Sequence, residues 1–292
     1  MSSLDAFIPS EVLTALVVDK LRKKLVAGDV ILRLDASGKD SISIPTLSEG
    51  SVSSYTKNST ITYSAADAAS QILQINQNYS YARSVDKVDT DSAMQNVVVK
   101  IVDDASFQLA KQADTYLLQT VMSDGAITVG GSTVRALGTS TTPISVVIDD
   151  SDHLSGVLDY LGRMSQRLNE VDVATEGRWA IVPPWFHSYL SISKVLETNG
   201  SVDANDVYSN GKVGRALGFD IRVSNNLTNA ITAGSHIYAG SYDAVAFADS
   251  MADPVQIIDL QTTHGYGVKG LYRYGGKAIQ GAALAKGIVS QA

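Results

Sequence analysis

Apolar residues recur every three or four positions between residues 89 and 123, and this spacing predicts a helix with one buried stripe. At about 1.5 Å per residue, a helix of this length spans roughly 50 Å, well beyond a typical globular helix. We therefore expect a long supporting helix, here called the beam, along which other parts of the chain pack. The stripe consists of Met94, Val98, Ile101, Ala105, Leu109, Ala113, Leu117 and Val121.

Two shorter helices are predicted by the same spacing. One is capped by Ser10, runs towards Leu25 and has Gly28 beyond its end. The other begins near Asp152 and runs to Leu168. Both have a single apolar face, which is typical of helices packed on a core.

Between residues 39 and 88 the pattern changes to alternation of apolar and polar residues, which predicts strands. Two alternating runs flank the polar stretch SEGSVSSYTKNST, so we expect an extended hairpin. A lone two-stranded hairpin is marginal in water, and this one has few apolar residues. We expect it to rest on something else, such as another subunit. The two runs carry Ile42, Ile44 and Leu47, then Leu73, Ile75, Tyr79 and Tyr81.

The stretch EGRWAIVPPWF, residues 176–186, predicts a rigid strand-to-helix corner. Trp179 opens a four-residue apolar run typical of a strand buried on both faces. Pro183 ends that strand and Pro184 starts a helix, because proline lacks the amide that a ladder needs but suits a first helical turn. Trp185 and Phe186 anchor the far side. The helix is expected to reach residues 199–200.

The rest of the chain predicts short strands separated by glycines. Asn210-Gly211 forms a tight-turn dipeptide, and a strand from Phe219 ends before Asn225 and Asn226. Residues 126–148 and 236–289 also have strand character.

Composition indicates a globular chain of about two domains. The 292 residues are 45% hydrophobic and 18% charged, and no apolar run of membrane-spanning length occurs. We expect no secretory signal and folding in a reducing cytosol. The absence of cysteine excludes disulfides, thiolate zinc sites and cysteine nucleophiles. A net charge of -7 argues against a dedicated DNA-binding protein but is compatible with a container for nucleic acid.

Candidate catalytic motifs are weak. The G-x-G-x-x-G of residues 265–270 is flanked by strand-forming residues, whereas a dinucleotide site needs a helix directly after it. Two acidic clusters stand where helices begin, so helix capping is the favoured interpretation. Two serine-lysine pairs lack companion motifs. We expect no cofactor and no metal. The candidate residues are Asp149, Asp150, Asp152 and His153; Asp86, Asp89 and Asp91; Ser54 with Lys57; Ser191 with Lys194; and His187, His236 and His264.

Several collinear blocks together resemble the major capsid proteins of tailed bacteriophages, in the branch similar to P22-type coat proteins. They are Phe7-Ile8-Pro9, IPTL at 44–47, YTKN at 55–58, ITY at 61–63, EGRWAIVPPWF, and NGKVGRALGFDIRVSNN at 210–226. The order and spacing of the blocks carry the resemblance more than any single word.

The resemblance implies an α+β fold of the HK97 capsid type. Residues 1–38 would form an N-terminal arm and helix, and residues 39–88 an extended E-loop. Residues 89–125 with 250–292 would form a P-domain built on a long spine helix, and residues 126–249 an A-domain of mixed sheet and helices.

Three groups of residues would carry function in this fold. The structural corner comprises Trp179, Pro183, Pro184, Trp185 and Phe186. The E-loop contacts to a neighbouring subunit comprise Ile44, Leu47, Tyr55, Lys57, Ile61, Tyr63, Leu73 and Ile75. The turn and strand motif comprises Asn210, Gly211, Gly214, Gly218, Phe219, Asn225 and Asn226.

The implied function is self-assembly, as hexamers and pentamers, into an icosahedral head around double-stranded DNA. The resemblance implies a virion protein, without enzymatic activity, that assembles in the host cytoplasm. Portal, scaffolding and decoration proteins would be partners, with no sequence-specific DNA binding and no membrane. Two alternatives remain: an encapsulin-like compartment that loads cargo enzymes, and an enzyme whose site is assembled only in three dimensions and lies in a deep polar pocket.

Overall fold

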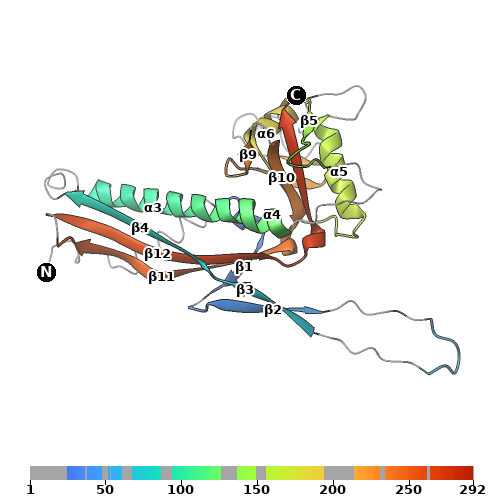
Figure 1. Ribbon diagram of the computed structural model, residues 1–292, viewed down its shortest axis with the longest axis horizontal. Coiled ribbons are helices and arrows are strands. Elements are labelled where there is room, and N and C mark those ends of the chain that lie inside the picture. The colour runs from blue at the N-terminus through green and yellow to red at the C-terminus, as the bar shows by residue number, and fades with distance from the viewer. Residues whose placement is uncertain are drawn as a thin grey trace.

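The computed structural model describes residues 25–36, 38–47, 52, 54–60, 68–86, 94–125, 137–148, 156–193, 214–230, 234–261 and 264–291. These residues form two β-sheets with helices packed on them and a hairpin that projects from the body (Figure 1). The expected α+β class is confirmed. The helix expected after Ser10 lies outside the described residues, as does the Asn210-Gly211 turn.

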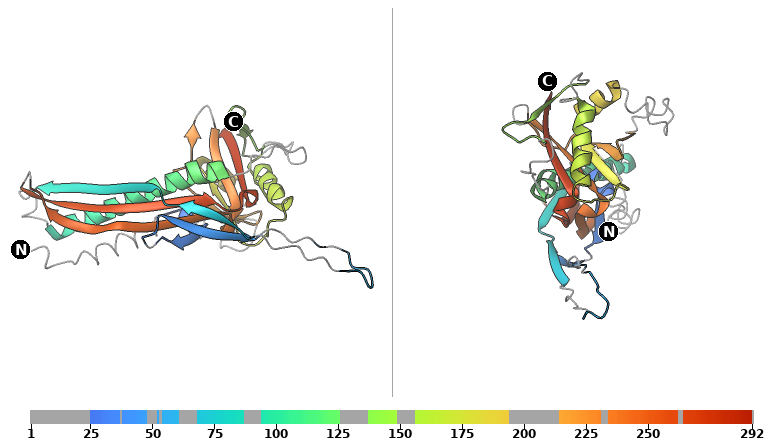
Figure 2. Two further views of the ribbon diagram at one scale, coloured as in Figure 1. Left: turned by 60° about the horizontal axis from the view of Figure 1, so that its bottom comes forward. Right: turned by 90° about the vertical axis from the view of Figure 1, so that its right-hand side faces the viewer.

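One sheet is long and narrow. Its four strands are ordered β1 (Leu32–Asp35), β11 (Val245–Asp259), β12 (Gly265–Ala278) and β4 (Gln77–Asp86). β1 runs parallel to β11, and the other pairs are antiparallel. Helix α3 (Met94–Tyr116) lies along this sheet, so the unit is an elongated slab (Figures 1 and 2).

The expected beam is confirmed over the described residues. α3 continues through a single π-helical turn, η2 (Leu117–Val121), into α4 (Met122–Gly125). The π turn packs both Leu117 and Val121 against Gly276 of β12, where an added Cβ would lie 3.1 and 3.0 Å from their methyl groups. The apolar repeat predicts the helix but not this turn, and the glycine against which the turn packs lies far away in the sequence.

The second sheet has seven strands. Six are ordered β5 (Ile144–Val146), β13 (Leu284–Gln291), β10 (Gly234–Ser241), β6 (Arg178–Val182), β8 (Phe219–Val223) and β7 (Arg215–Ala216), and β9 (Asn229–Ala230) pairs with β10. Helices α5 (Val157–Asn169) and α6 (Pro184–Ile192) pack on this sheet. One expected boundary is corrected here: residues 284–291 pair with β10 and β5, so the whole of 250–292 does not lie with the long helix.

The projecting hairpin consists of β2 (Ser41–Leu47) and β3 (Ala68–Gln74), paired antiparallel in a sheet of their own. The second alternating run of the sequence is therefore divided between two sheets. Leu73 lies in the hairpin, whereas Tyr79 and Tyr81 lie in β4 and pair with β12. The chain leaves the hairpin at residues 75–76, between β3 and β4.

A shared core joins the two larger sheets. Buried side chains from the long helix pack with Trp179 and Tyr238 of the seven-stranded sheet and with Tyr272 and Tyr274 of the four-stranded sheet. The chain crosses between the sheets through two 3-10 turns, η3 (Tyr242–Ala244) and η4 (Gly281–Ala283). One apolar cluster and two short connections thus help to hold the two units together.

Candidate functional site

The base of the hairpin packs on its own subunit. Leu73 is fully buried and Ile75 is 4% exposed, in a cluster with Ala246 and Ala248 of β11. The expectation that Leu73 and Ile75 contact a neighbouring subunit is therefore wrong, because both side chains are already covered. Ile44 is half-buried against the same cluster.

Polar contacts fix this base. Gln71 donates from Nε2 to the carbonyl of Ile279 at 3.2 Å, and Lys277 donates from Nζ to the carbonyl of Ile72 at 3.2 Å. The Arg273 guanidinium contacts the Asp40 carboxylate at 2.6 Å. Because these bonds join the hairpin to β12 and its continuation, the hairpin leaves the body in a defined direction.

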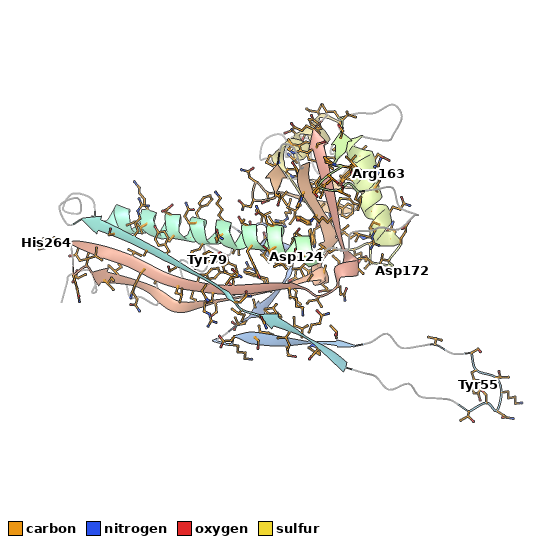
Figure 3. The ribbon with its side chains drawn as sticks, viewed as in Figure 1. Tyr55, Tyr79, Asp124, Arg163, Asp172 and His264 are labelled. Atoms are coloured by element: carbon orange, nitrogen blue, oxygen red, sulfur yellow. The ribbon has the colours of Figure 1, made fainter. Side chains whose placement is uncertain are left out.

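The tip of the hairpin is exposed. Val52 is 101% exposed and Tyr55 is 67% exposed, and Figure 3 places Tyr55 at the far end of the projection. The amide of Ser59 donates to the carbonyl of Thr56 at 2.9 Å, which closes a turn at the end. Lys57 lies in this turn and is exposed. The tip presents an apolar residue, an aromatic ring and a cation.

The remaining expected hairpin contacts are not placed. Ile61 and Tyr63 lie outside the described residues, and the side chain of Leu47 is not among those described. Ile72 was missed by sequence reasoning. It is 54% exposed on the face of β3 opposite Leu73, and strict alternation along the strand could have identified it.

The strand-to-helix corner forms as expected. All five residues of β6 are buried, Pro183 is the extended residue before the helix, and Pro184 occupies the first turn of α6. Phe186 is fully buried. Trp185 donates from Nε1 to the hydroxyl of Ser235 at 3.1 Å, which links the helix to β10.

Aromatic rings and one arginine brace the two ends of the corner. The Trp185 ring packs edge-to-face on Phe186 and Tyr189, with centroids 5.7 and 5.5 Å apart. At the other end Arg178 donates to the carbonyls of Ala174 and Val173, at 2.8 and 2.5 Å. Burial lowers the pKa of Arg178. The corner is thus fixed at both ends.

The turn and strand motif forms a tight hairpin. Leu217 and Gly218 have φ of 50° and 83°, and they join β7 to β8 as a two-residue turn. This conformation suits glycine, so Gly218 has a structural role. Phe219 is fully buried in the core of the seven-stranded sheet.

Residues around this hairpin secure its ends. The amide of Ile221 donates to the carbonyl of Gly214 at 3.3 Å. After β8, the amide of Asn226 donates to the hydroxyl of Ser224 at 3.2 Å, and Asn225 between them is exposed. These contacts give the described part of the motif, from Gly214 onwards, a structural explanation.

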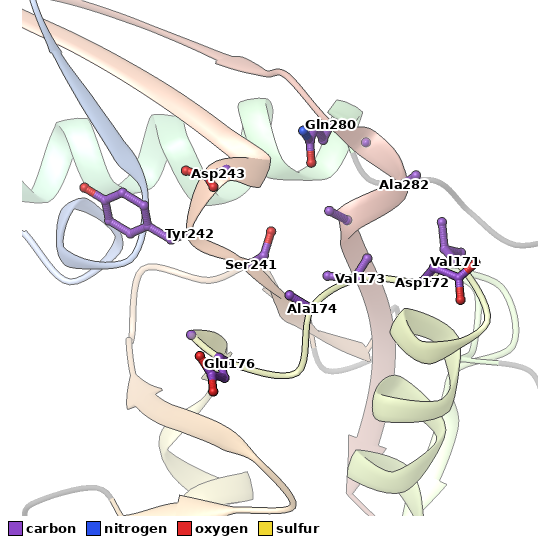
Figure 4. Close-up of a pocket in the computed structure, with 13 residues that line it drawn as sticks. Val171, Asp172, Val173, Ala174, Glu176, Ser241, Tyr242, Asp243, Gln280 and Ala282 are labelled. Carbon is purple, nitrogen blue, oxygen red and sulfur yellow. The ribbon is translucent and has the colours of Figure 1, made fainter. Parts of the chain in front are cut away.

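A groove of about 580 Å³ lies where the chain crosses between the sheets (Figure 4). Three carboxylates line it, and the ring of Tyr242, 46% exposed, stands beside them. Its described lining contains no histidine or lysine that could act as a base for Ser241. The lining residues are Val171, Asp172, Val173, Ala174, Glu176, Gly177, Ser241, Tyr242, Asp243, Gln280, Gly281, Ala282 and Ala283.

A polar cluster that sequence reasoning missed lies at the end of the long helix. Lys286 of β13 donates from Nζ to the hydroxyl of Ser123 at 2.7 Å, and His236 Nδ1 lies 3.1 Å from the hydroxyl of Tyr238. Burial lowers the pKa of Lys286. Burial and the nearby Lys286 lower that of His236 to about 4.

Ser123 and Lys286 resemble a catalytic serine with its lysine base, but their position in the fold indicates a structural role. Neither Ser123 nor Lys286 lines the groove, and their hydrogen bond joins the end of the long helix to the seven-stranded sheet. No local signal in the sequence relates these residues, which are 163 positions apart.

The remaining candidate motifs of the sequence lie in strands, in a helix and in the hairpin tip. Residues 265–270 lie inside β12, so no helix follows the glycines. Ser54 and Lys57 are in the exposed tip and Ser191 is in α6. Asp86 ends β4, and His264 lies at the opposite extreme of the molecule from Tyr55 (Figure 3). Outside the described residues lie Asp89, Asp91, Asp149, Asp150, Asp152, His153 and Lys194.

The described residues include no group of three or more histidine, cysteine or acidic side chains placed to hold a metal ion. No helix among them is long and apolar enough to cross a membrane.

Known proteins that are similar to this chain match it over most of its length. A family model described as phage capsid protein matches residues 52–287. A solved structure from Mycobacterium phage Che8 is 21% identical, with a TM-score of 0.64 over 86% of this chain and 85% of that one. A capsid of an empty GTA particle is 10% identical, with a TM-score of 0.62 over 91% and 90%.

A third similar structure is described as a virus-like particle. It comes from Pyrococcus furiosus and is 12% identical, with a TM-score of 0.56 over 94% of this chain and 97% of that one. No curated protein matches the sequence.

Proposed function

Because the chain belongs to the phage capsid protein family and is thereby a capsid protein of phage-type shells, we propose that it closes these shells as hexamers and pentamers. The observation that carries the proposal is the projecting hairpin. Its base is fixed to the body by Gln71 and Lys277, while Val52 and Tyr55 at its tip are exposed and belong to none of the apolar clusters formed by the described residues. A second copy supplies the apolar partner that the tip lacks.

The contact surface on each copy is the tip and the outward face of the hairpin. Tyr55, Lys57 and Ile72 form its described part. Leu47, Ile61 and Tyr63 remain contact residues expected from the sequence. Aromatic and apolar anchors contribute most to such interfaces when water is excluded from them. Leu73 and Ile75 act inside the subunit and set the direction of the hairpin.

The rest of the subunit is a rigid tile. The four-stranded sheet with the long helix corresponds to the P-domain of the HK97 fold, and the seven-stranded sheet corresponds to the A-domain. The corner at Pro183 and Pro184 keeps α6 at a fixed angle to β6, so that many copies meet with repeatable geometry.

The shell is a virion component that encloses double-stranded DNA. The net charge of -7 suits a wall that holds DNA without strong salt-dependent binding to phosphate. Portal, scaffolding and decoration proteins complete the particle, and assembly takes place in the host cytoplasm. The alternative is an encapsulin-like compartment. Analysis of the contents of purified shells separates the two, because an encapsulin-like shell would hold cargo enzymes in place of DNA.

A matched pair of substitutions tests the hairpin. Tyr55→Ala removes the anchor at the tip, whereas Tyr242→Ala removes a ring that is also exposed but stands beside the groove. Sedimentation velocity is expected to show Tyr55→Ala as unassembled subunits with native circular dichroism and Tyr242→Ala as shells. Normal shells from Tyr55→Ala would show that Tyr55 at the tip is not needed for the contact between subunits.

A further inference from the structure

The tip of the projecting hairpin ends in a turn that presents a lysine. The amide of Ser59 donates to the carbonyl of Thr56 at 2.9 Å, and the amide of Thr56 donates to the hydroxyl of Ser59 at 3.3 Å. Asn58 has a φ of 69°, which is typical of the third residue of a type II turn. Lys57 therefore occupies the second position of the turn, and its side chain is exposed.

The charge of this tip is positive. Lys57 is the only charged residue among the described tip residues, which are 52 and 54–60. None of the ion pairs between described residues includes Lys57. Tyr55, two positions before it, is 67% exposed. The tip thus presents a cation beside an aromatic ring.

The groove at the crossing between the sheets has the opposite charge (Figure 4). Asp172 and Glu176 stand on the wall formed by residues 171–177, and Asp243 stands on the wall formed by the crossing connections. All three are exposed, and none of the ion pairs between described residues includes them. The described lining contains no lysine, arginine or histidine that would balance their charge.

Both walls of the groove are fixed by hydrogen bonds. Arg178 donates to the carbonyls of Val173 and Ala174 and so holds the first wall. On the second wall, the amide of Gln280 donates to the carbonyl of Ala244 at 3.2 Å. Because these bonds form within the subunit, the groove is shaped before anything binds in it, and binding there costs little reorganisation.

The tip of one subunit is directed away from its own groove. Figure 3 places Tyr55 at the far end of the projection and Asp172 on the body of the molecule. Gln71 and Lys277 fix the direction of the hairpin, so a tip reaches the groove of another copy. The groove, of about 580 Å³, has room for the few side chains of a turn.

We propose that this groove receives the hairpin tip of a second copy, with Lys57 placed among Asp172, Glu176 and Asp243. The inference rests on the proposed function, because it names the surface to which the exposed tip binds. Opposite charges steer the tip to the groove and fix the register of the contact. Since tip and groove are different surfaces, each copy offers both, and such head-to-tail contacts generate rings when the rotation between copies closes.

An exchange of charges tests the pairing in the full chain. Lys57→Glu sets a carboxylate against three others, so shells are expected to be lost. Adding Glu176→Lys and Asp243→Lys to the same chain reverses both sides of the contact, and shells are expected to return. Electron microscopy and sedimentation velocity measure the shells, and circular dichroism checks folding. Tyr242→Ala keeps all three carboxylates and therefore keeps the contact.

A second double variant separates the groove from the net charge. Asp259 is exposed at the end of β11, whereas Asp243 lies just before the start of that strand. Lys57→Glu combined with Asp259→Lys restores the wild-type net charge without changing the groove, and it is expected to form no shells. Shells from this variant would overturn the proposal, because net charge alone would then explain the loss.

Two further results would overturn the groove as the receptor of the tip. One is normal shells from Lys57→Glu. The other is a folded exchange variant that forms no shells, which would leave the hairpin contact itself standing. If the exchange variant does not fold, Lys57→Glu with Glu176→Lys decides, and it is expected to recover part of the shells. Failure of the proposed function is seen separately, as a small uniform oligomer for wild type.

Discussion

The indole Nε1 of Trp185 donates to the hydroxyl of Ser235 at 3.1 Å, and this bond joins the first turn of α6 to β10 across the corner. Ser235 is 4% exposed, so its hydroxyl has little access to water. The hydrogen bond therefore helps to fix the angle between sheet and helix.

Trp185→Phe is expected to lower the free energy of unfolding by about 1–2 kcal/mol, because it leaves the hydroxyl with one partner fewer in a buried site. Tyr189→Phe keeps the ring that packs on Trp185 and is expected to change stability by less than about 0.5 kcal/mol. Urea titration of both variants measures the difference. Equal stabilities would show that the bond contributes little.

Pro184→Gly is expected to yield shells of irregular size from a folded subunit. Glycine at the first turn of α6 removes the fixed φ that sets the corner, and destabilises it by about 1–2 kcal/mol. Pro184→Ala keeps a good helix former there and serves as the control. Electron microscopy gives the size distributions, and identical distributions for wild type and Pro184→Gly would refute a geometric role for the corner.

Gly275→Ala is expected to detach the hairpin from its base. A Cβ at Gly275 would overlap the carbonyl oxygen of Gln74, so the backbone of β3 must shift, at about 2–3 kcal/mol. Gly162→Ala in α5 meets nothing within 4 Å and is expected to stabilise the helix by about 1 kcal/mol. Thermal unfolding compares the two variants. An unchanged thermal stability of Gly275→Ala would mean that the backbone of β3 can shift at this position without cost.

His236 is expected to make the subunit less stable as the pH falls from about 6.5 towards 4. Its folded pKa is lowered to about 4, so below 6.5 the unfolded chain binds a proton that the folded chain does not. The contribution is present above pH 6.5 and is lost as the pH falls through this window. Urea titrations of His236→Gln at pH 7 and pH 5 should show a smaller difference than wild type, and an unchanged difference would exclude His236 as the cause.

Local patterns in the sequence predict much of the fold. The apolar repeat from Met94 to Val121 identifies the long helix, and the paired prolines identify the corner, because both signals lie within a few residues of the structure that they specify. The family resemblance adds the HK97-type arrangement, which likeness to solved phage capsids confirms.

Local sequence patterns do not show which other strands and helices each strand packs against. Alternation shows that Leu73 and Ile75 have a buried side, but it does not show that the side is covered by β11 of the same subunit. For the same reason the sequence does not show that residues 284–291 pair with β10 rather than lie with the four-stranded sheet. Contacts such as Asp114 with Val26, or Lys286 with Ser123, join residues 88 and 163 positions apart and become apparent only in the structure.

Electron microscopy of the purified protein, together with a variant lacking residues 48–60, tests the central claim most directly. Both proteins are expressed alone and with the genes that flank the coding sequence. The account predicts closed shells for wild type, with five-fold and six-fold clusters, and folded, unassembled subunits for the deletion. A small uniform oligomer for wild type under both conditions, or normal shells from the deletion, would contradict it.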